Sequence, residues 1–294
     1  MFKGSLVAMI TPFTESGEID ERGIKELVEF HIKNGTNGIV PCGTTGESPT
    51  LSHEEHKKVI DITLEAVAGR VPVIAGTGSN STREAFDLTS HAKEAGADGA
   101  LIVVPYYNKP TQKGLYIHYR KLAEEIDIPI IVYNVPSRTG VNLLPETLAK
   151  LAQLKNIVAV KEASGNLDQM TQIVELCGDN IILLSGDDKL LLPVLSIGGK
   201  GVISVVANII PGDVANMISE FENGNYQKAQ DIFLSKIYPL SSAMFYETNP
   251  IPVKTSAQLM GLPSGNLRLP LSPMSESNLA KLKADLVKFN LLEE

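Results

Sequence analysis

The sequence predicts an α/β fold, a (β/α)8 TIM barrel followed by a C-terminal helical extension. Eight short apolar runs alternate with amphipathic segments of helical period, an arrangement typical of parallel strands joined by helices. Most runs are rich in valine and isoleucine, as strands buried on both faces are. A doubly wound open sheet shows the same alternation, but the count of eight and the lack of a Gly-x-Gly-x-x-Gly motif after the first run favour a closed barrel.

The expected elements alternate along the chain. Strands are expected at Leu6–Ile10, Gly38–Pro41, Val71–Ala75, Ala100–Val104, Ile128–Tyr133, Ile157–Lys161, Ile181–Leu184 and Gly201–Val205. Helices are expected at Glu21–Asn34, Ser52–Ala68, Thr82–Gly96, Thr111–Ile126, Pro145–Leu154, Asn166–Cys177, Asp188–Ile197 and Pro211–Asn223. We expect residues 1–224 to form the catalytic barrel and residues 225–294 the extension, with helices at Tyr226–Met244, Pro252–Met260 and Ser275–Phe289.

The net charge of this 294-residue chain is −8, which argues against nucleic acid or an anionic membrane as its main partner. The two cysteines form neither a disulfide framework nor a zinc-binding pattern. The apolar segment near the N-terminus is too short for a signal peptide, and no stretch approaches the roughly 20 apolar residues that span a bilayer. We therefore expect a cytoplasmic protein.

A lysine, Lys161, ends the sixth apolar run. A lysine in apolar surroundings has a lowered pKa, and its neutral amine attacks carbonyl groups. The alternative, and the commoner case for such a run by itself, is a strand-end lysine whose ammonium reaches water. Tyr133 ends the preceding run and is either a core residue or a residue of the barrel mouth. Because the carboxyl ends of barrel strands meet at one face, we expect both side chains in a site there.

Further polar residues follow other strands. The turn Gly43-Thr44-Thr45-Gly46 can direct N–H and hydroxyl donors at one anion. A carboxylate is the simpler guest because the Gly-Lys-Ser/Thr of a phosphate loop is absent, and a purely structural turn is the alternative. Arg138 lies in a loop, where it is either solvated or captures a substrate carboxylate. If Tyr106 and Tyr107 continue the strand before them, one should point inward and the other outward.

No metal site is expected. None of the five histidines falls at a strand end beside acidic partners. His53 and His56 can share a helix face, but no third ligand is evident. Asp187 and Asp188 open a helix and are expected to cap it.

Three stretches resemble signature motifs of the dihydrodipicolinate synthase family, which belongs to the pyruvate-dependent class I aldolases. They are Gly43–Glu47, Tyr133–Gly140 and Val160–Gly165, and the similarity runs from Phe2 to the C-terminal helices. The resemblance implies condensation of pyruvate with L-aspartate-4-semialdehyde in lysine and diaminopimelate biosynthesis, without a metal or organic cofactor. It also implies a homotetramer built as a dimer of dimers.

Two alternatives stay open at this point. The Gly-x-x-Gly-Glu turn and the tyrosine and lysine strand ends are shared with N-acetylneuraminate lyase and with 2-keto-3-deoxy sugar acid aldolases. Arg138, within Pro-Ser-Arg-Thr-Gly, favours the synthase because a small acidic aldehyde needs a second cationic group. A non-enzymatic barrel that senses amino acids would not need Lys161 and Tyr133 together.

The resemblance implies a role for each site residue. Lys161 would form a Schiff base with pyruvate, and Tyr133 would transfer protons. Thr44 and Tyr107 would complete a hydroxyl relay, with Tyr107 coming from the partner subunit. Thr45 would hold the pyruvate carboxylate, and the backbone at Gly186 and Ile203 would line the pocket. Arg138 would hold the carboxylate of the second substrate. Inhibition by L-lysine would use Ser48, Leu51, His53, His56, Asn80, Glu84 and Tyr106, all of them present, with Pro49 standing where alanine is expected.

Overall fold

Eight parallel strands form the wall of a barrel in the computed structural model, which describes residues 2–293. The strands are β1 (Gly4–Ala8), β2 (Gly38–Val40), β3 (Ile74–Gly76), β4 (Gly99–Val103), β5 (Ile130–Asn134), β6 (Ile157–Glu162), β7 (Ile182–Ser185) and β8 (Gly201–Ser204). Their order is β2-β1-β8-β7-β6-β5-β4-β3, and a parallel bridge between Ile39 and Val73 joins the two ends. The predicted closed barrel is therefore confirmed, and each strand overlaps the apolar run that predicted it.

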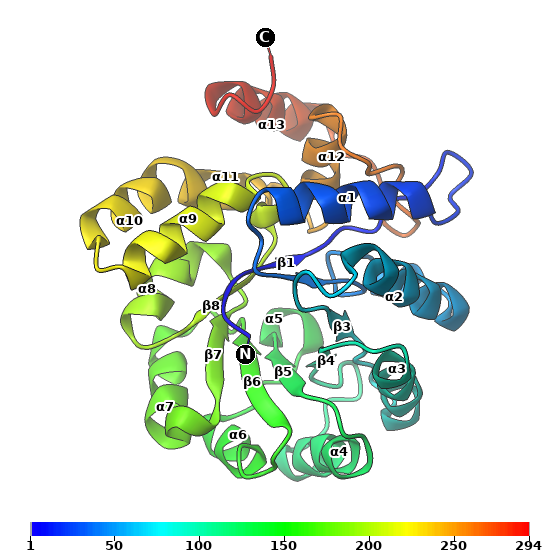
Figure 1. Ribbon diagram of the computed structural model, residues 1–294, viewed down its shortest axis with the longest axis vertical. Coiled ribbons are helices and arrows are strands. Elements are labelled where there is room, and N and C mark those ends of the chain that lie inside the picture. Colours follow the sequence, from blue (N-terminus) through cyan, green and yellow to red (C-terminus); the bar gives the residue numbers. More distant parts are fainter. Residues whose placement is uncertain (1, 294) are drawn as a thin grey trace.

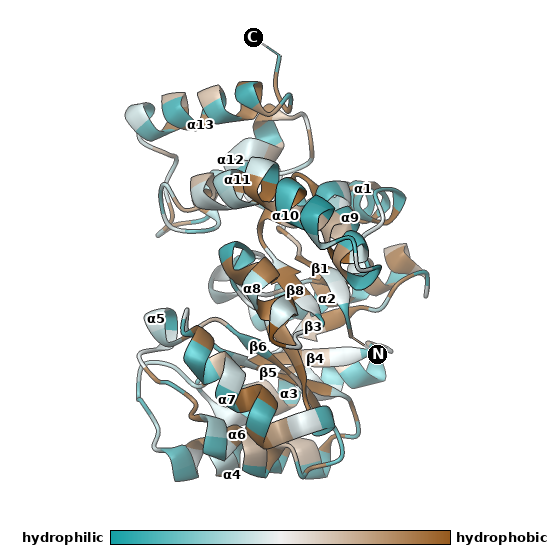
Figure 2. Cartoon of the chain, turned by 90° about the vertical axis from the view of Figure 1, so that its left-hand side faces the viewer, coloured by the Kyte–Doolittle hydropathy of each residue, from teal (hydrophilic) through white to brown (hydrophobic). Residues whose placement is uncertain are grey.

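Helices surround the strands, as Figure 1 shows. They are α1 (Glu21–Lys33), α2 (His53–Val67), α3 (Thr82–Glu94), α4 (Gln112–Glu125), α6 (Pro145–Leu151), α7 (Leu167–Cys177), α8 (Leu191–Ser196) and α9 (Pro211–Glu222). Each was expected, because its apolar residues recur at helical spacing. In Figure 2 the strands are mostly brown, while the helices carry teal stretches on their outer faces.

One short α-helix was not predicted. The segment Pro136–Thr139, expected as a loop, forms the short helix α5, and Arg138 lies on it. Proline stands at its start, and Gly140 follows with φ of 71°. Four residues are too few to show a helical period, but a proline at the start and a glycine just past the end are the usual pair of boundary residues.

The barrel interior is filled by alternate residues of the strands. In β6, Ala159 packs in the interior cluster and Val160 packs in the outer layer against the helices. Successive side chains of a strand point to opposite faces, so Lys161 shares the inward face with Ala159. Tyr133 belongs to the same interior cluster. The period of the strand thus directs both polar side chains into the barrel.

The chain after α9 is helical, as expected. It comprises α10 (Tyr226–Ile232), a π-helical turn (Phe233–Ile237), α11 (Tyr238–Ala243), α12 (Ile251–Leu259) and α13 (Glu276–Lys288). Figure 1 places α12 and α13 beyond α1, away from α4 and α6.

A buried ion pair fixes this C-terminal part to the barrel. Lys254 of α12 is 1% exposed, and its Nζ lies 2.6 Å from Glu47 Oε1 in the Gly-Thr-Thr-Gly-Glu turn. The same ammonium donates to the carbonyl oxygens of Thr11 and Asn266 at 3.0 and 2.9 Å. Glu47 Oε2 accepts from the backbone N–H of Arg268 at 3.1 Å. The turn that precedes α2 is therefore held by residues far along the sequence.

We expect Lys254→Met to lower the free energy of unfolding by about 3–5 kcal/mol, because it leaves the Glu47 carboxylate buried without its counterion. Urea unfolding followed by circular dichroism measures the loss. Arg22→Ala is the control, since it removes the Arg22–Glu26 pair, in which the arginine side chain is 89% exposed. That change should have little effect on the free energy of unfolding, because solvent screens the pair. Equal losses in the two variants would contradict the prediction.

Candidate active site

Lys161 and Tyr133 lie side by side at the carboxyl ends of β6 and β5. The register pairs the two residues directly, and Lys161 Nζ lies 4.2 Å from the centroid of the Tyr133 ring. Both side chains are buried, at 6% and 7% exposure. The structure therefore brings together the two residues that the strand pattern singled out, and it excludes the lysine with a solvated ammonium.

The surroundings of Lys161 favour the neutral form of its amine near neutral pH. Burial lowers the pKa of its amine to about 7; the nearby carboxylate of Asp188 acts in the opposite direction, and the Arg138 guanidinium lowers the pKa further. Burial also raises the pKa of the Tyr133 phenol, while Arg138 and the Thr44 hydroxyl counteract the rise. At pH 7 a large share of the amine is thus neutral while the phenol keeps its proton.

The rate at which a carbonyl compound adds to Lys161 should follow the neutral fraction of the amine. A lysine with a pKa of about 7 gains roughly tenfold in neutral fraction per pH unit below that value and levels off above it. Trapping of pyruvate with cyanoborohydride at subsaturating pyruvate, quantified by mass spectrometry, measures the profile. Asp188→Asn should shift the inflection to lower pH, because it removes the charge that raises the pKa. An inflection near pH 10 in the unmodified protein would disprove the assignment.

The two aspartates after β7 differ in role. Asp187 caps the short helical turn Asp188–Leu190, with its Oδ1 accepting from the Lys189 N–H at 2.9 Å, as expected. Asp188 was also expected to cap but does not. It is buried, and its Oδ2 accepts from the N–H groups of Val205 and Val206 at 2.9 and 3.0 Å. It therefore ties the end of β7 to the end of β8, close enough to act on the pKa of Lys161.

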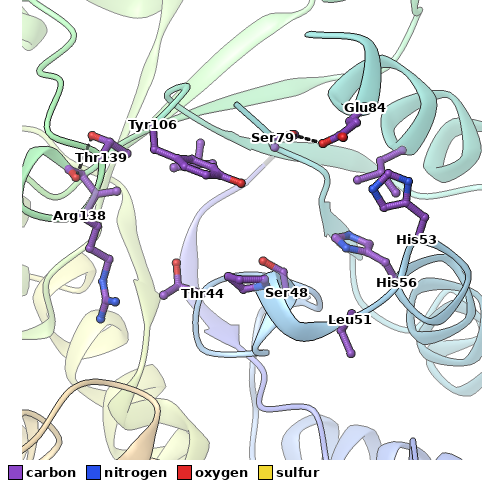
Figure 3. A pocket seen from close by; sticks show the side chains of 15 residues that line it. Thr44, Ser48, Leu51, His53, His56, Ser79, Glu84, Tyr106, Arg138 and Thr139 are labelled. Atoms are coloured by element: carbon purple, nitrogen blue, oxygen red, sulfur yellow. Dashed lines mark hydrogen bonds between the residues drawn. The ribbon is translucent and has the colours of Figure 1, made fainter. Parts of the chain in front are cut away.

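A cavity of about 350 Å³ opens beside these strand ends (Figure 3). It brings together most of the predicted site residues: Thr44, Arg138, Ser48, Leu51, His53, His56, Glu84 and Tyr106. A smaller cavity of about 40 Å³ shares Thr44 and Ser48 with it and reaches Tyr133. The hydroxyl of Thr44 thus stands between the large cavity and the buried phenol.

Some predicted residues lie outside the large cavity. The predicted residues that are not in its lining are Lys161, Tyr133, Thr45, Gly186, Ile203, Asn80 and Tyr107. Tyr107 is 85% exposed, whereas Tyr106 lines the cavity. The condition for the predicted alternation is not met, because β4 ends at Val103 and Tyr107 has a φ of 71°; the cavity is nevertheless lined by Tyr106 and not by Tyr107. Ser79, which the sequence did not single out, donates its hydroxyl to Glu84 Oε2 at 2.6 Å, and Figure 3 shows this pair on the cavity wall.

The backbone packs closely around the Lys161 side chain at Gly186. Gly186 follows β7, and its N–H donates to the Glu162 carbonyl at 2.8 Å. A Cβ at this position would lie 2.6 Å from the Ala163 Cβ and 3.2 Å from the Lys161 Cγ, so only glycine leaves the lysine side chain its room. Ile203 of β8 is buried in the barrel interior.

Two polar contacts from the C-terminal part reach the site, and neither was predicted. Asn249 is 4% exposed, and its Nδ2 donates to Thr45 Oγ1 at 3.1 Å. Its backbone carbonyl accepts from Arg138 Nη2 at 3.2 Å. Arg138 is therefore exposed but held at the cavity, rather than free in a loop.

His56 is tied to the structure rather than to an ion. Its Nε2 lies 2.6 Å from the Gly76 carbonyl oxygen, and burial lowers the pKa of the ring. Among residues 2–293, no group of three or more His, Cys, Asp and Glu side chains is placed to hold a metal ion.

Within the same described range, every helix is too short or too polar to cross a membrane.

Comparisons with known proteins agree with this geometry. Residues 1–289 match the Dihydrodipicolinate synthetase family. A 4-hydroxy-tetrahydrodipicolinate synthase from Syntrophus aciditrophicus is 59% identical over 292 residues, which cover 99% of this chain and 100% of that protein. The crystal structure of dihydrodipicolinate synthase from Aquifex aeolicus superposes with a TM-score of 0.97 at 52% identity and covers 100% of both chains.

Two further solved structures contain small molecules. The enzyme from Acinetobacter baumannii, complexed with pyruvate, has a TM-score of 0.97 at 43% identity and covers 99% of this chain and 100% of that one. The enzyme from Cyanidioschyzon merolae, with lysine bound, has a TM-score of 0.96 at 42% identity and covers 99% of each chain. Full-length identity above half and a common fold leave one conclusion: this chain belongs to the dihydrodipicolinate synthetase family.

Proposed function

We propose that this chain catalyses the reaction of the 4-hydroxy-tetrahydrodipicolinate synthases, the condensation of pyruvate with L-aspartate-4-semialdehyde. The observation that carries the proposal is the buried Lys161 amine, with a pKa of about 7, directly beside the Tyr133 phenol. A neutral amine next to a proton donor is what imine formation with a ketone requires. Relatives with this name, more than half identical over full length, support the same reaction.

The chemistry follows from the groups present. Lys161 Nζ attacks the C2 carbonyl of pyruvate, and the carbonyl oxygen leaves as water. The resulting iminium withdraws electrons, so a methyl proton is lost and an enamine forms, whose carbon attacks the aldehyde. Tyr133 exchanges protons in these steps, with Thr44 linking it to the cavity and Tyr107 of a partner subunit completing the relay. Attack of the second substrate's amino group on C2 then closes the ring and releases Lys161.

The two substrates each bring a carboxylate. Thr45 holds that of pyruvate in a pocket lined by the backbone at Gly186 and Ile203, and Arg138 at the cavity holds that of the semialdehyde. A sugar-acid aldolase would need hydrogen-bonding groups for a polyhydroxyl chain in place of this cation. A barrel that only senses amino acids would not need a lysine of lowered pKa. Both alternatives therefore account for the site less well than the synthase does.

The deciding experiment is reductive trapping. The protein is incubated with pyruvate and cyanoborohydride, and the intact mass and tryptic peptides are measured. We expect one adduct per chain, on Lys161. A coupled assay with aspartate semialdehyde, and N-acetylmannosamine as the competing acceptor, then distinguishes the synthase from the lyase. A protein that forms no adduct on Lys161 would refute the proposal.

We also propose that L-lysine inhibits the enzyme by binding at the cavity wall. Ser48, Leu51, His53, His56, Glu84 and Tyr106 line one cavity with Arg138, and Asn80 lies just before α3. Glu84 offers a carboxylate to the ligand's ammonium, and Tyr106 a hydroxyl to its carboxylate. A relative with lysine bound supports this proposal.

Glu84→Gln should weaken inhibition by lysine about 10-fold or more, since it removes the charged partner of the ligand's ammonium. The concentration of lysine giving half-maximal inhibition, measured in the coupled assay, tests this. The uninhibited rate should change little. Glu94→Gln, at the exposed far end of the same helix, is the control. Unchanged inhibition in Glu84→Gln would exclude this carboxylate as the ammonium site.

A homotetramer, built as a dimer of dimers in the cytoplasm, completes the proposal. It accords with Tyr107, which is 85% exposed on a single chain and so available to a neighbouring subunit. Sedimentation equilibrium measures the oligomeric state. A fully active monomer would exclude a proton relay that includes Tyr107 of a partner subunit.

A further inference from the structure

Asn249 joins the C-terminal helices to both places where a substrate carboxylate is expected. Its side-chain Nδ2 donates to Thr45 Oγ1 at 3.1 Å, and its backbone carbonyl accepts from Arg138 Nη2 at 3.2 Å. The sequence separates Asn249 from Thr45 by 204 residues, and both are almost fully buried. A contact of this kind, dry and between distant segments, fixes two groups relative to one another.

The direction of the Thr45 bond determines what the hydroxyl can do. A threonine hydroxyl has one proton and two acceptor lone pairs. Because the Asn249 amide occupies a lone pair as donor, the single Thr45 proton stays available for another acceptor. A carboxylate is acceptor-only and takes that proton in a charge-assisted hydrogen bond.

The carbonyl oxygen of the Asn249 side chain supports a role for this residue in the site as well as in packing. Asn249 Oδ1 is buried and has no hydrogen-bond partner within the described residues. A buried polar atom without a partner costs free energy, and most buried polar side-chain atoms are paired, so this oxygen is an exception that packing alone does not account for. The segment itself is held by Lys254, one turn further on, through its ion pair with Glu47.

We infer that Asn249 is a positioning residue that keeps the Thr45 hydroxyl proton directed at the pyruvate carboxylate. This inference rests on the proposed function, because it takes pyruvate as the guest of the Gly43-Thr44-Thr45-Gly46 turn. Asn249 acts through Thr45 and need not touch the substrate. The C-terminal part of the chain thereby contributes to binding of the first substrate, in addition to holding the barrel.

The test is a double-mutant cycle read from the pyruvate concentration that gives half-maximal trapping. Thr45→Val should raise that concentration about 10- to 100-fold, as loss of a hydrogen bond to a charged group does, and Asn249→Ala about 3- to 10-fold. In a Thr45→Val background, Asn249→Ala should add less than about twofold. In a Thr45→Ser background, which keeps the hydroxyl, its full effect should return. All these variants keep the backbone carbonyl that accepts from Arg138.

Asn249→Asp tests the direction of the bond. A carboxylate at 249 would accept the Thr45 proton, so the pyruvate concentration for half-maximal trapping should rise more than in Asn249→Ala. Most of that rise should vanish in the Thr45→Val background. A rise that survives intact there would be charge repulsion alone and would overturn the inference. The inference would also be overturned if Asn249→Ala lowered the maximal trapping rate but left the pyruvate concentration for half-maximal trapping unchanged. Absence of any adduct in the unmodified protein would instead refute the proposed function.

Discussion

We expect Lys161→Ala to remove the pyruvate adduct completely and to lower turnover by about 10³-fold or more, as deletion of a covalent nucleophile does. No other lysine should take over, because Lys161 is the lysine that both faces the barrel interior and has a pKa of about 7. Intact mass after trapping with pyruvate and the coupled assay measure the two losses together.

Lys155→Ala is the matched control for that variant. Lys155 precedes the same strand but is exposed, so its loss should change neither adduct yield nor turnover. Lys161→Arg should behave like Lys161→Ala, since a guanidinium stays protonated and cannot attack a ketone. An adduct of pyruvate mass in Lys161→Ala, on any lysine, would show that the nucleophile lies elsewhere.

Tyr133→Phe is expected to lower kcat by about 10²- to 10⁴-fold, the range for loss of a positioned acid–base group. The ring stays beneath Lys161, so packing is kept and only the phenol is lost. Because burial raises the pKa of that phenol, the group is protonated at neutral pH and serves first as a proton donor. Trapping with pyruvate should slow while its final yield stays complete.

Tyr119→Phe separates this loss from a general effect of removing a buried hydroxyl. Tyr119 is fully buried, and its hydroxyl donates to the Ile102 carbonyl at 2.9 Å in the layer outside the barrel. Its removal should cost about 1 kcal/mol in stability and leave kcat unchanged. If the two variants lost turnover equally, Tyr133 would have no special part in proton transfer.

The sequence predicted the barrel well because each strand is a local signal. A buried parallel strand needs only a few consecutive apolar residues, and the helices between them show a full period. Lys161 and Tyr133 were found for the same reason: a polar residue at the end of an apolar run stands out. The short helix α5 was missed because four residues carry no period.

The contacts made by the C-terminal part could not be predicted in the same way. Asn249 and Lys254 meet the Gly-Thr-Thr-Gly-Glu turn across about two hundred residues, and no periodicity encodes such a distance. One signal was available: Lys254 is the only charged residue in Ile251–Leu259, and Glu47 follows a turn of neutral residues. Isolated charges in apolar or neutral segments tend to pair with one another.

The Lys254–Glu47 pair joins a part of the chain that is synthesised early to one that is synthesised late. All eight strands precede residue 205, so synthesis can complete the barrel wall while α12 does not yet exist. Until Asn249 and Lys254 emerge, the turn at Thr44 and Thr45 lacks the groups that fix it. A growing chain can therefore complete the strands of its barrel before this turn is fixed, and residues 249–254 then fix the turn against the finished wall.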